Sequence, residues 1–409
     1  MPDQLIPDLF RTEYSKLVAV ICNKYGLDQI DLAEDIVSDT FLKATESWKL
    51  KGVPEKPQAW LYTVAKNACK DHFKHKKVFD SKVATYLAKT QQSFSAADLD
   101  VSEANIQDSQ LKMIFAVCDA SNTTSSQVVL ALRILCGFNI DEIANALLTT
   151  KANVNKRLTR AKQNLKDFNV HDFNVTDYLV SQRLDNVLLV IYLLFNEGYY
   201  SSNPSYTIRK DLCYEAMRLL LLMCESKLTG VPGTFGLMSL FCFHASRFDA
   251  RVNDKGEFIL FEKQNKSLWD KDLIAKGEFY LAKAAEDKTH KYYLEAVIAY
   301  WHTRKKISEH TKWENIFQAY NLLLRVEYSL TRAVNRTFAM AKARGYDQAL
   351  PEALKLKMAD NFQYQCLLLE LYKDIDLVAH RKHLELALGL TDNPMSKKVL
   401  LDKYGYLSN

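Results

Sequence analysis

The residues whose types and spacing could do chemistry in this 409-residue chain are basic and amide side chains near the middle of the sequence. Between Lys151 and Lys166 there are six lysines or arginines and no acid. A helix that reads DNA needs amide or guanidinium groups for base edges and cations beside them for phosphates. The segment therefore predicts a DNA-recognition helix, although the solvated basic face of an ordinary helix has the same composition. The side chains placed on its free side are Lys151, Asn153, Asn155, Lys156, Arg157, Arg160 and Lys162.

A second group combines aromatic rings with cations in the helix expected to follow Pro57. Rings stack on unpaired bases and amines neutralise the nucleic-acid backbone, so this mixture favours contact with single-stranded nucleic acid. The alternative is that the rings lie in a core while the lysines face water. The candidate residues are Trp60, Tyr62, Lys66, Asn67, Lys70 and Lys74.

The sign of the charge reverses on the preceding helix, whose apolar side is formed by Ile36, Val37 and Phe41. An acidic face is usually only solvated, and here it would repel DNA. If this face has a partner, we expect a protein with a basic surface. Its four acids are Asp31, Glu34, Asp35 and Asp39.

Metal binding and catalysis find less support in the sequence. The pairs His72–His75 and His380–His383 have a helical i, i+3 spacing, but lysines or arginines surround each pair and would repel a cation. An enzyme site would have to be assembled from distant polar residues whose geometry nothing fixes, namely Asn196, Glu197, His244, Arg247 and Asp249. We therefore expect no catalytic residue, no metal and no cofactor.

The elements that must position these side chains are expected to be helices. Glycine contributes only 12 residues, about 3% against a typical ~7%, and proline only 8. Tight turns between strands need both residues, so an all-α fold is favoured. The same scarcity leaves no glycine-rich phosphate loop, which disfavours nucleotide-dependent enzymes.

The location predicted from the sequence is the cytoplasm. No apolar run approaches the roughly 20 residues that cross a bilayer. The N-terminal residues lack the basic segment followed by an apolar segment that marks a secretion signal. The eight cysteines are scattered without a C-x-x-C pair, so reduced core thiols are expected. We expect no contact with a membrane.

Three structured segments and one linker follow from the apolar periodicity. Residues 9–79 predict three helices, with one apolar face formed by Leu17, Val20 and Ile21 and another by Ile36, Val37, Phe41 and Leu42. Residues 80–108 shift to Ser, Gln, Asp and Ala, which indicates a flexible linker. Residues 109–170 contain a short helix from Ile140 to Leu147, a break, and a basic helix from Lys151. Thr150 is the expected N-cap, and this order is typical of a helix-turn-helix.

The last segment, 177–409, is expected to be a helical domain. The turn signal from Asn253 to Gly256 followed by EFILFE could form a small β-hairpin. An offset of 34 residues superposes Val334 on Leu368, and likewise Leu350 on Leu384 and Ala353 on Ala387, which is the tetratricopeptide period. Stacked helix pairs would explain this offset; an irregular helical bundle is the alternative.

The order of these features resembles a group IV (extracytoplasmic-function) sigma factor of the sigma-70 family. AEDIVSDTFLKA and WLYTVAKNACKDHFKHKK resemble the family's region 2, and FNIDEIANALLTTKANVNKRLTRAK resembles region 4. The C-terminal stretches VIYLLFNEGYYSS, DLCYEAMRLL and LTDNP resemble the subgroup with a long tetratricopeptide-like extension. The resemblance implies a protein that binds core RNA polymerase, through its beta-prime and beta subunits, and promoter DNA to start transcription.

The resemblance also implies roles for individual residues. The acidic helix would bind the clamp helices of the beta-prime subunit, chiefly through Asp35 and Asp39. Asn67 matches the position that helps hold a base flipped from the minus-10 element, and Trp60 and the loop from Lys49 to Gln58 would border that pocket. Residues 151–162 match the helix that reads the minus-35 element, although Asn153 stands where many relatives carry Thr. The extension would be a regulatory module that binds a protein or peptide.

A different reading keeps the helix-turn-helix and drops the polymerase. The chain would then be a conventional transcription regulator with a tetratricopeptide-like effector domain. Such a protein needs neither the acidic helix nor the region around Trp60, so co-purification with core polymerase separates the two readings.

Overall fold

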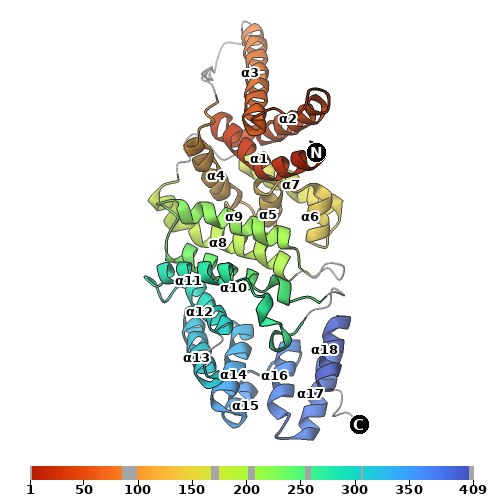
Figure 1. Cartoon of the computed structure of the whole chain (residues 1–409), viewed down its shortest axis with the longest axis vertical. Coiled ribbons are helices and arrows are strands. Elements are labelled where there is room, and N and C mark those ends of the chain that lie inside the picture. Colours follow the sequence, from red (N-terminus) through yellow and green to blue (C-terminus); the bar gives the residue numbers. More distant parts are fainter. Residues whose placement is uncertain are drawn as a thin grey trace. The chain divides into compact units, whose positions relative to one another are not determined.

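The computed structural model describes residues 2–84, 99–166, 175–200, 208–253, 259–304 and 307–404. Within these ranges the regular elements are helices and no strand is present, which confirms the all-α expectation (Figure 1). The chain divides into two compact units. The first consists of Met1–Asn203 with Asp211–Thr229, and the second of Pro204–Lys210 with Gly230–Asn409.

The first unit begins with α1 (Pro2–Tyr25), the short turn η1 (Leu27–Gln29), α2 (Ile30–Lys51) and α3 (Pro57–Ala84). The expected apolar faces are buried, with Leu17, Val20 and Ile21 on α1 and Val37 and Phe41 on α2. Leu42, expected on the same buried face, is instead 56% exposed, because the core side of α2 is completed by Ala44 and Trp48. The predicted helices of this segment are otherwise confirmed.

The helix-turn-helix follows α4 (Glu103–Val117), α5 (Thr124–Leu130) and the π-helical turn η2 (Ala131–Leu135). It consists of α6 (Ile140–Ala146) and α7 (Lys151–Lys166). Asn139 and Glu142 form a capping box that starts α6. The Thr150 hydroxyl accepts the backbone N–H of Asn153 at 3.2 Å and so caps α7 as predicted.

The predicted linker is shorter at both ends than the sequence indicated. α3 continues to Ala84, and α4 begins at Glu103 after the N-cap Ser102. Ile106 is buried, so its neighbours in α4 are tied to the fold. Residues 85–98 of the predicted linker lie outside the described residues.

Two helices of the predicted C-terminal segment belong to the first unit: α8 (Asp177–Tyr199) and nearly all of α9 (Lys210–Glu225). The Asn186 amide donates to the Cys118 carbonyl at 2.6 Å, and Arg218 donates to the Leu135 carbonyl at 2.7 Å. Arg183 pairs with Asp119. These helices thus pack against the α4–η2 segment that precedes the helix-turn-helix, and the division of the chain differs from the boundary expected at residue 177.

α8 is long and apolar enough to cross a membrane by length and composition. Its Val187, Leu188 and Ile191 are buried, and it contacts α4 and α5. These contacts are those of a core helix in a folded unit.

The second unit is a succession of helices from α10 (Pro232–Ala245) to α18 (Pro394–Tyr404), with the short turns η4 (Phe248–Ala250), η5 (Phe261–Lys263) and η6 (Lys266–Leu268) near its start. α10 lies against α11 (Lys271–Ala284) and α12 (Lys291–Thr303). A Cβ at Gly236 would come within 2.8 Å of the Tyr293 backbone nitrogen, so glycine permits the close approach of α10 to α12.

The remaining helices of this unit pack mainly against their neighbours in sequence. They are α13 (Glu309–Val326), α14 (Leu330–Arg344), α15 (Tyr346–Lys355), α16 (Phe362–Tyr372) and α17 (Leu377–Gly389). The 34-residue offset superposes α14 on α16 and α15 on α17. The superposed residues Val334, Leu368, Ala353 and Ala387 are all buried.

The expected β-hairpin is absent among the described residues. Val252 makes an isolated bridge, and the Ile259 N–H donates to the Arg251 carbonyl at 2.8 Å. Phe261 already belongs to η5, so the apolar end of EFILFE turns instead of extending. Residues 254–258, which include most of the predicted turn, lie outside the described ranges.

Candidate functional site

The basic face of α7 lies on the surface of the first unit. Lys151, Asn155, Lys156 and Arg160 are exposed, and Arg157 is half-buried. The opposite face is fixed in the core by Val154, Leu158, Ala161 and Leu165. The amphipathic pattern read from the sequence therefore describes α7 correctly, and most of the residues expected to face DNA are accessible.

A cleft of about 370 Å³ opens beside this face. Cations of α7 form one side, and polar residues of the turn before α5 form the other. Hydroxyl, amide and guanidinium groups are the donors that contact phosphate oxygens in protein–DNA complexes. This turn was not predicted from the sequence, although its polar run SNTTSS is visible there. The lining residues are Ser121, Asn122, Thr123, Ser126, Asn153, Lys156, Arg157, Arg160 and Asn164.

Two residues expected on the DNA side are engaged elsewhere. The Asn153 side-chain amide donates to the Thr149 hydroxyl at 2.7 Å, so this amide helps to fix the turn before α7. Lys162 Nζ donates to Asp31 Oδ1 at 3.0 Å and also contacts Glu34. Lys162 therefore faces α2 in this structure.

Glu34 is the centre of a buried polar cluster and not part of an exposed acidic face. Its side chain is 4% exposed and accepts hydrogen bonds from the Tyr14 hydroxyl at 2.8 Å and Arg133 Nε at 2.6 Å, besides the contact with Lys162. We call Tyr14, Glu34, Arg133 and Lys162 the Glu34 cluster. It joins α1, α2, η2 and α7, which are far apart in sequence.

The other acids of α2 remain on the surface. Asp31, Asp35 and Asp39 are exposed and lie one turn apart, so they share one side of the helix. Asp31 pairs with Lys162 and, at 2.9 Å, with Lys166. Burial alone would raise the pKa of Asp31, but the hydrogen bonds from Lys166 and Lys162 hold it below its ordinary value.

The charge of Lys162 is held by the same contacts. Burial would lower the pKa of Lys162, but the nearby carboxylates of Glu34 and Asp31 raise it above its ordinary value. The pKa of Asp31 falls and that of Lys162 rises, and both shifts favour the charged form, because each partner stabilises the charge of the other. The α7–α2 contact is thus between full charges at neutral pH.

The aromatic and basic residues of α3 divide into core and surface. Tyr62 is buried, and its hydroxyl donates to Glu13 Oε2 at 2.9 Å, so this ring belongs to the core, as the alternative reading allowed. Trp60 is half-buried and meets Trp48 edge to face, with ring centroids 5.4 Å apart. Asn67, Lys70 and Lys74 are exposed, and Lys66 is half-buried. Of the six candidate residues, the Trp60 ring, the Asn67 amide and the three lysines therefore remain accessible on α3.

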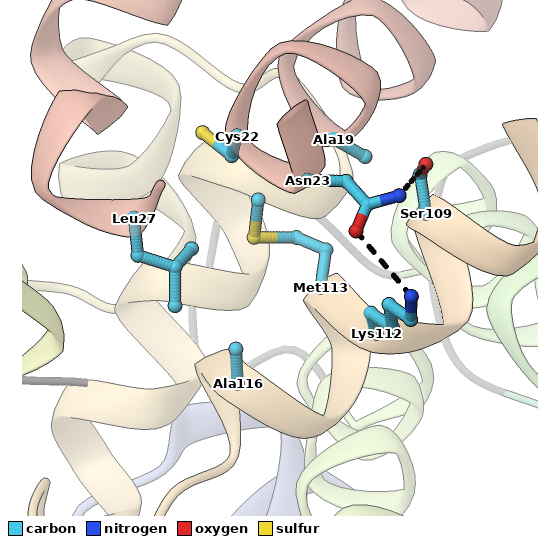
Figure 2. Close-up of a pocket in the computed structure, with 8 residues that line it drawn as sticks. All are labelled: Ala19, Cys22, Asn23, Leu27, Ser109, Lys112, Met113 and Ala116. Carbon is cyan, nitrogen blue, oxygen red and sulfur yellow. Dashed lines mark hydrogen bonds between the residues drawn. The ribbon is translucent and has the colours of Figure 1, made fainter. Parts of the chain in front are cut away.

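A small cavity of about 10 Å³ marks the contact between α1 and α4 (Figure 2). Asn23 donates to Ser109 at 2.9 Å and accepts from Lys112 at 3.4 Å. Ala19, Cys22, Leu27, Met113 and Ala116 supply the apolar lining. The space is too small for a ligand, so the contact is a structural joint.

The residues weighed for metal binding and catalysis have structural partners. His380 Nδ1 lies 2.8 Å from the Leu369 carbonyl, and His383 Nδ1 lies 2.6 Å from Gln365 Oε1. Asp249 pairs with Lys210 at 2.5 Å. No group of three His, Cys, Asp or Glu side chains that could hold a metal occurs in the described part of the chain. The eight cysteines are free, and most are buried, in keeping with reduced core thiols.

Residues 10–78, which form α1, α2 and most of α3, match the sigma-70 region 2 family. This match supports a sigma-70 family sigma factor acting in transcription initiation, a class that is not enzymatic and whose partners are core RNA polymerase and promoter DNA. Residues 183–285, from α8 to the end of α11, match a family of unknown function, DUF6596.

A relative of known sequence extends the comparison beyond these domains. The uncharacterized protein R00370 of Rhizobium meliloti (strain 1021) is 31% identical over 350 residues, covering 83% of this chain and 81% of the relative. The chain belongs to the same family as this protein. No solved structure matches the chain.

Proposed function

We propose that this protein is a group IV sigma factor that binds core RNA polymerase, recognises promoter DNA and promotes transcription initiation. Its proposed location is the cytoplasm. The observation that carries the proposal is the sigma-70 region 2 domain, with exposed acids on α2 and an exposed amide and cations on α3. An acidic surface suits a basic protein partner, and the α3 surface suits DNA. The two activities that a sigma factor combines thus have separate surfaces.

The polymerase-binding surface is centred on Asp35 and Asp39, with Asp31 one turn away. Glu34, predicted for the same role, is buried in its cluster and would act by holding α2 in place. The beta-prime subunit is the proposed partner of this surface. The beta subunit is proposed as a second contact from the family resemblance alone.

The promoter-binding surfaces lie on α3 and α7. Trp60 and Asn67 would hold an unpaired base of the minus-10 element, while Lys70 and Lys74 neutralise phosphates. Asn155 and Lys156 would read base edges of the minus-35 element, and Arg157 and Arg160 would contact its phosphates. The roles proposed for these four α7 residues are supported by the exposure of the polar face of the helix and by the cleft beside it.

The segment 177–409 is proposed to regulate these activities. Equivalent burial in α14–α17 supports a tetratricopeptide-like arrangement for its later part, which would bind a protein or peptide. Its first two helices belong to the first unit and bond to Cys118 and Leu135, ahead of the helix-turn-helix, so a truncation that tests regulation should end near Thr229 and not near residue 170. Equal open-complex formation by that truncated chain and the full chain would remove the regulatory role.

Co-purification with core polymerase tests the proposal against a conventional regulator. The variant Asp35→Lys with Asp39→Lys is expected to weaken core binding at least tenfold, since both charges face the partner. The matched control is Glu286→Lys with Glu385→Lys, which makes the same charge change at exposed sites of the second unit. Absence of core binding by the natural chain would favour the regulator, and equal binding by both variants would remove the acidic surface from the interface.

A further inference from the structure

The second unit brings together a group of basic side chains outside both proposed DNA-binding surfaces. His302 lies in the last turn of α12 and Lys312 in the first turns of α13, two neighbouring helices (Figure 1). The centre of the Phe261 ring lies 5.0 Å from that of His302 and 5.7 Å from Lys312 Nζ. The Trp313 ring lies 5.5 Å and 5.3 Å from the same two groups. The guanidinium of Arg247, which precedes η4, lies 5.1 Å from the Phe261 ring, so three separate elements supply basic groups to one place.

The charge of Lys312 is buried and poorly compensated. Its side chain is 7% exposed. Within the described part of the chain its carboxylate partner is Glu309, at 3.4 Å, and Glu309 is itself 72% exposed. Glu309 also accepts from Trp313 Nε1 at 3.0 Å. Because burying a charge beside a distant, solvated partner costs free energy, a lysine in this position suits a ligand that brings its own negative charge.

His302 offers an unused hydrogen-bonding atom at the same place. Its Nδ1 is buried and has no hydrogen-bond partner among the described residues. Burial and the charges of Arg247 and Lys312 lower the pKa of His302 to about 3. The ring is therefore neutral at pH 7 and carries one N–H donor. An anion between the imidazole and the ammonium would accept from both.

We propose that Lys312 and His302, in the field of Arg247, form a binding site for a phosphate group. The ammonium and the imidazole N–H would each donate to one phosphate oxygen. The guanidinium of Arg247, which also contacts His244 Nδ1 at 3.2 Å, would add positive charge from a third element. A phosphate dianion suits this arrangement better than a carboxylate, because it has more charge and more oxygens to offer to separate donors.

The site lies at the edge of the second unit, where a small anion can enter. His302, Phe261 and Trp313 are half-buried, and Glu309 is exposed beside Lys312. The carboxylate of Glu309 would repel an anion, so we expect a dissociation constant on the order of 1 mM or below. The inference concerns the second unit alone and goes beyond the sigma-factor proposal, since it gives segment 177–409 a ligand other than a protein or peptide.

NMR of the full natural chain, labelled with nitrogen-15 at histidine, tests the site. The His302 signals are assigned from their loss in His302→Gln. Inorganic phosphate, added at constant ionic strength, should shift these signals along a curve that saturates with a constant of about 1 mM or below. Glycerol phosphate, titrated in parallel, shows whether a phosphate ester or the free ion is the preferred source. Absence of a saturable shift with both, or equal affinity for acetate, would overturn the proposal.

A lysine variant separates a binding role from a structural one. Lys312→Met keeps the side-chain length, removes the charge and should weaken phosphate binding roughly tenfold or more. The melting temperature of the phosphate-free chain should stay the same or rise, because a poorly compensated buried charge is gone. Lys291→Met is the matched control, since Lys291 Nζ lies 3.3 Å from Glu327 and 5.3 Å from the Tyr292 ring centre. Equal phosphate affinity of the two variants would refute the site.

A change of opposite direction gives an independent measurement. Glu309→Gln removes the carboxylate charge beside Lys312 and keeps an acceptor for Trp313 Nε1. Phosphate affinity should rise about two- to fivefold at low salt, as expected for one exposed charge. The gain should disappear near 1 M salt, where charges are screened within about 3 Å. Unchanged or weaker phosphate binding by Glu309→Gln at low salt would contradict the proposed position of the anion.

Discussion

Replacing Glu34 by alanine should strongly destabilise the first unit. The carboxylate is 4% exposed and accepts from Tyr14, Arg133 and Lys162. Its removal leaves two cations in poorly solvated positions, with side-chain exposures of 23% for Arg133 and 16% for Lys162. Breaking a buried ion pair from one side costs about 3–5 kcal/mol, and the residual exposure of the cations places this case near 3 kcal/mol.

Two further variants separate the contribution of the Glu34 charge to the free energy of unfolding from that of its hydrogen bonds. Glu34→Gln keeps the shape and one acceptor but loses the charge, and should cost about 2 kcal/mol. Tyr14→Phe removes one neutral donor and should cost about 1 kcal/mol. Asp35→Ala, the next residue along α2, is exposed and serves as the control, with an expected change within about 0.5 kcal/mol.

Hydrogen exchange read by mass spectrometry measures the effect in the right part of the molecule. Slow exchange should be lost from peptides of α1, α2 and α7 in Glu34→Ala, while peptides of the second unit keep their protection. The melting temperature of the first unit should fall by about 6–12 °C, at 2–4 °C per kcal/mol for a unit of this size. If Glu34→Ala is no more destabilising than Asp35→Ala, the Glu34 cluster does not form in solution and the reasoning is wrong.

Other predictions follow from the remaining surfaces and from the second unit. Trp60→Ala and Asn67→Ala should impair strand opening more than closed-complex formation, with each lost stack worth roughly 1–3 kcal/mol; normal permanganate reactivity of promoter thymines in both variants would contradict this. Arg160→Ala should lower the salt slope of minus-35 binding by about one unit on every sequence, whereas Asn155→Ala should relax base preference, and equal shifts for both would place base reading elsewhere. Burial would raise the pKa of Glu370, but a Tyr404 hydrogen bond and the Lys403 and Lys342 cations lower it to about 2. Because its folded pKa is depressed, Glu370→Gln should destabilise the second unit by about 3 kcal/mol at pH 7, and the difference in urea unfolding should shrink as the pH falls below about 4.5; a pH-independent difference would refute this.

The local features of the fold were predictable because their signals are local. Thr150 and the break before Lys151 lie next to the helix that they start, and the apolar period of α7 is complete within the helix. Leu17, Val20 and Ile21 were placed in the core from spacing alone. A sequence read as a succession of helices thus gives their order and most of their buried faces.

The long-range contacts were not predictable in this way. Glu34 looked like a solvated acid, because its partners Tyr14, Arg133 and Lys162 lie 20, 99 and 128 positions away. Tyr62 looked like a ring for stacking on bases, but Glu13, 49 positions earlier, binds its hydroxyl in the core. Charged and aromatic side chains suit both a core partner and a ligand, so composition alone does not decide between them.

The division of the chain was hard to foresee for a similar reason. The helical periodicity of residues 177–409 suggested one separate domain, but α8, its first helix, contacts α4 and α5 of the first unit. Asn186 and Arg218 then tie α8 and α9 to the carbonyl groups of Cys118 and Leu135. The boundary expected from the sequence at residue 177 therefore differs from the division between the two packed units.

Run-off transcription with purified core polymerase tests the central claim most directly. On genomic fragments selected for binding by the full chain, addition of the chain should produce transcripts from defined start sites, with thymines near each start becoming reactive to permanganate. The Asp35→Lys, Asp39→Lys variant should lose these transcripts and still bind the upstream duplex. Binding of the natural chain to the fragments without any transcript from core polymerase would contradict the account and favour a regulator that is not a polymerase subunit.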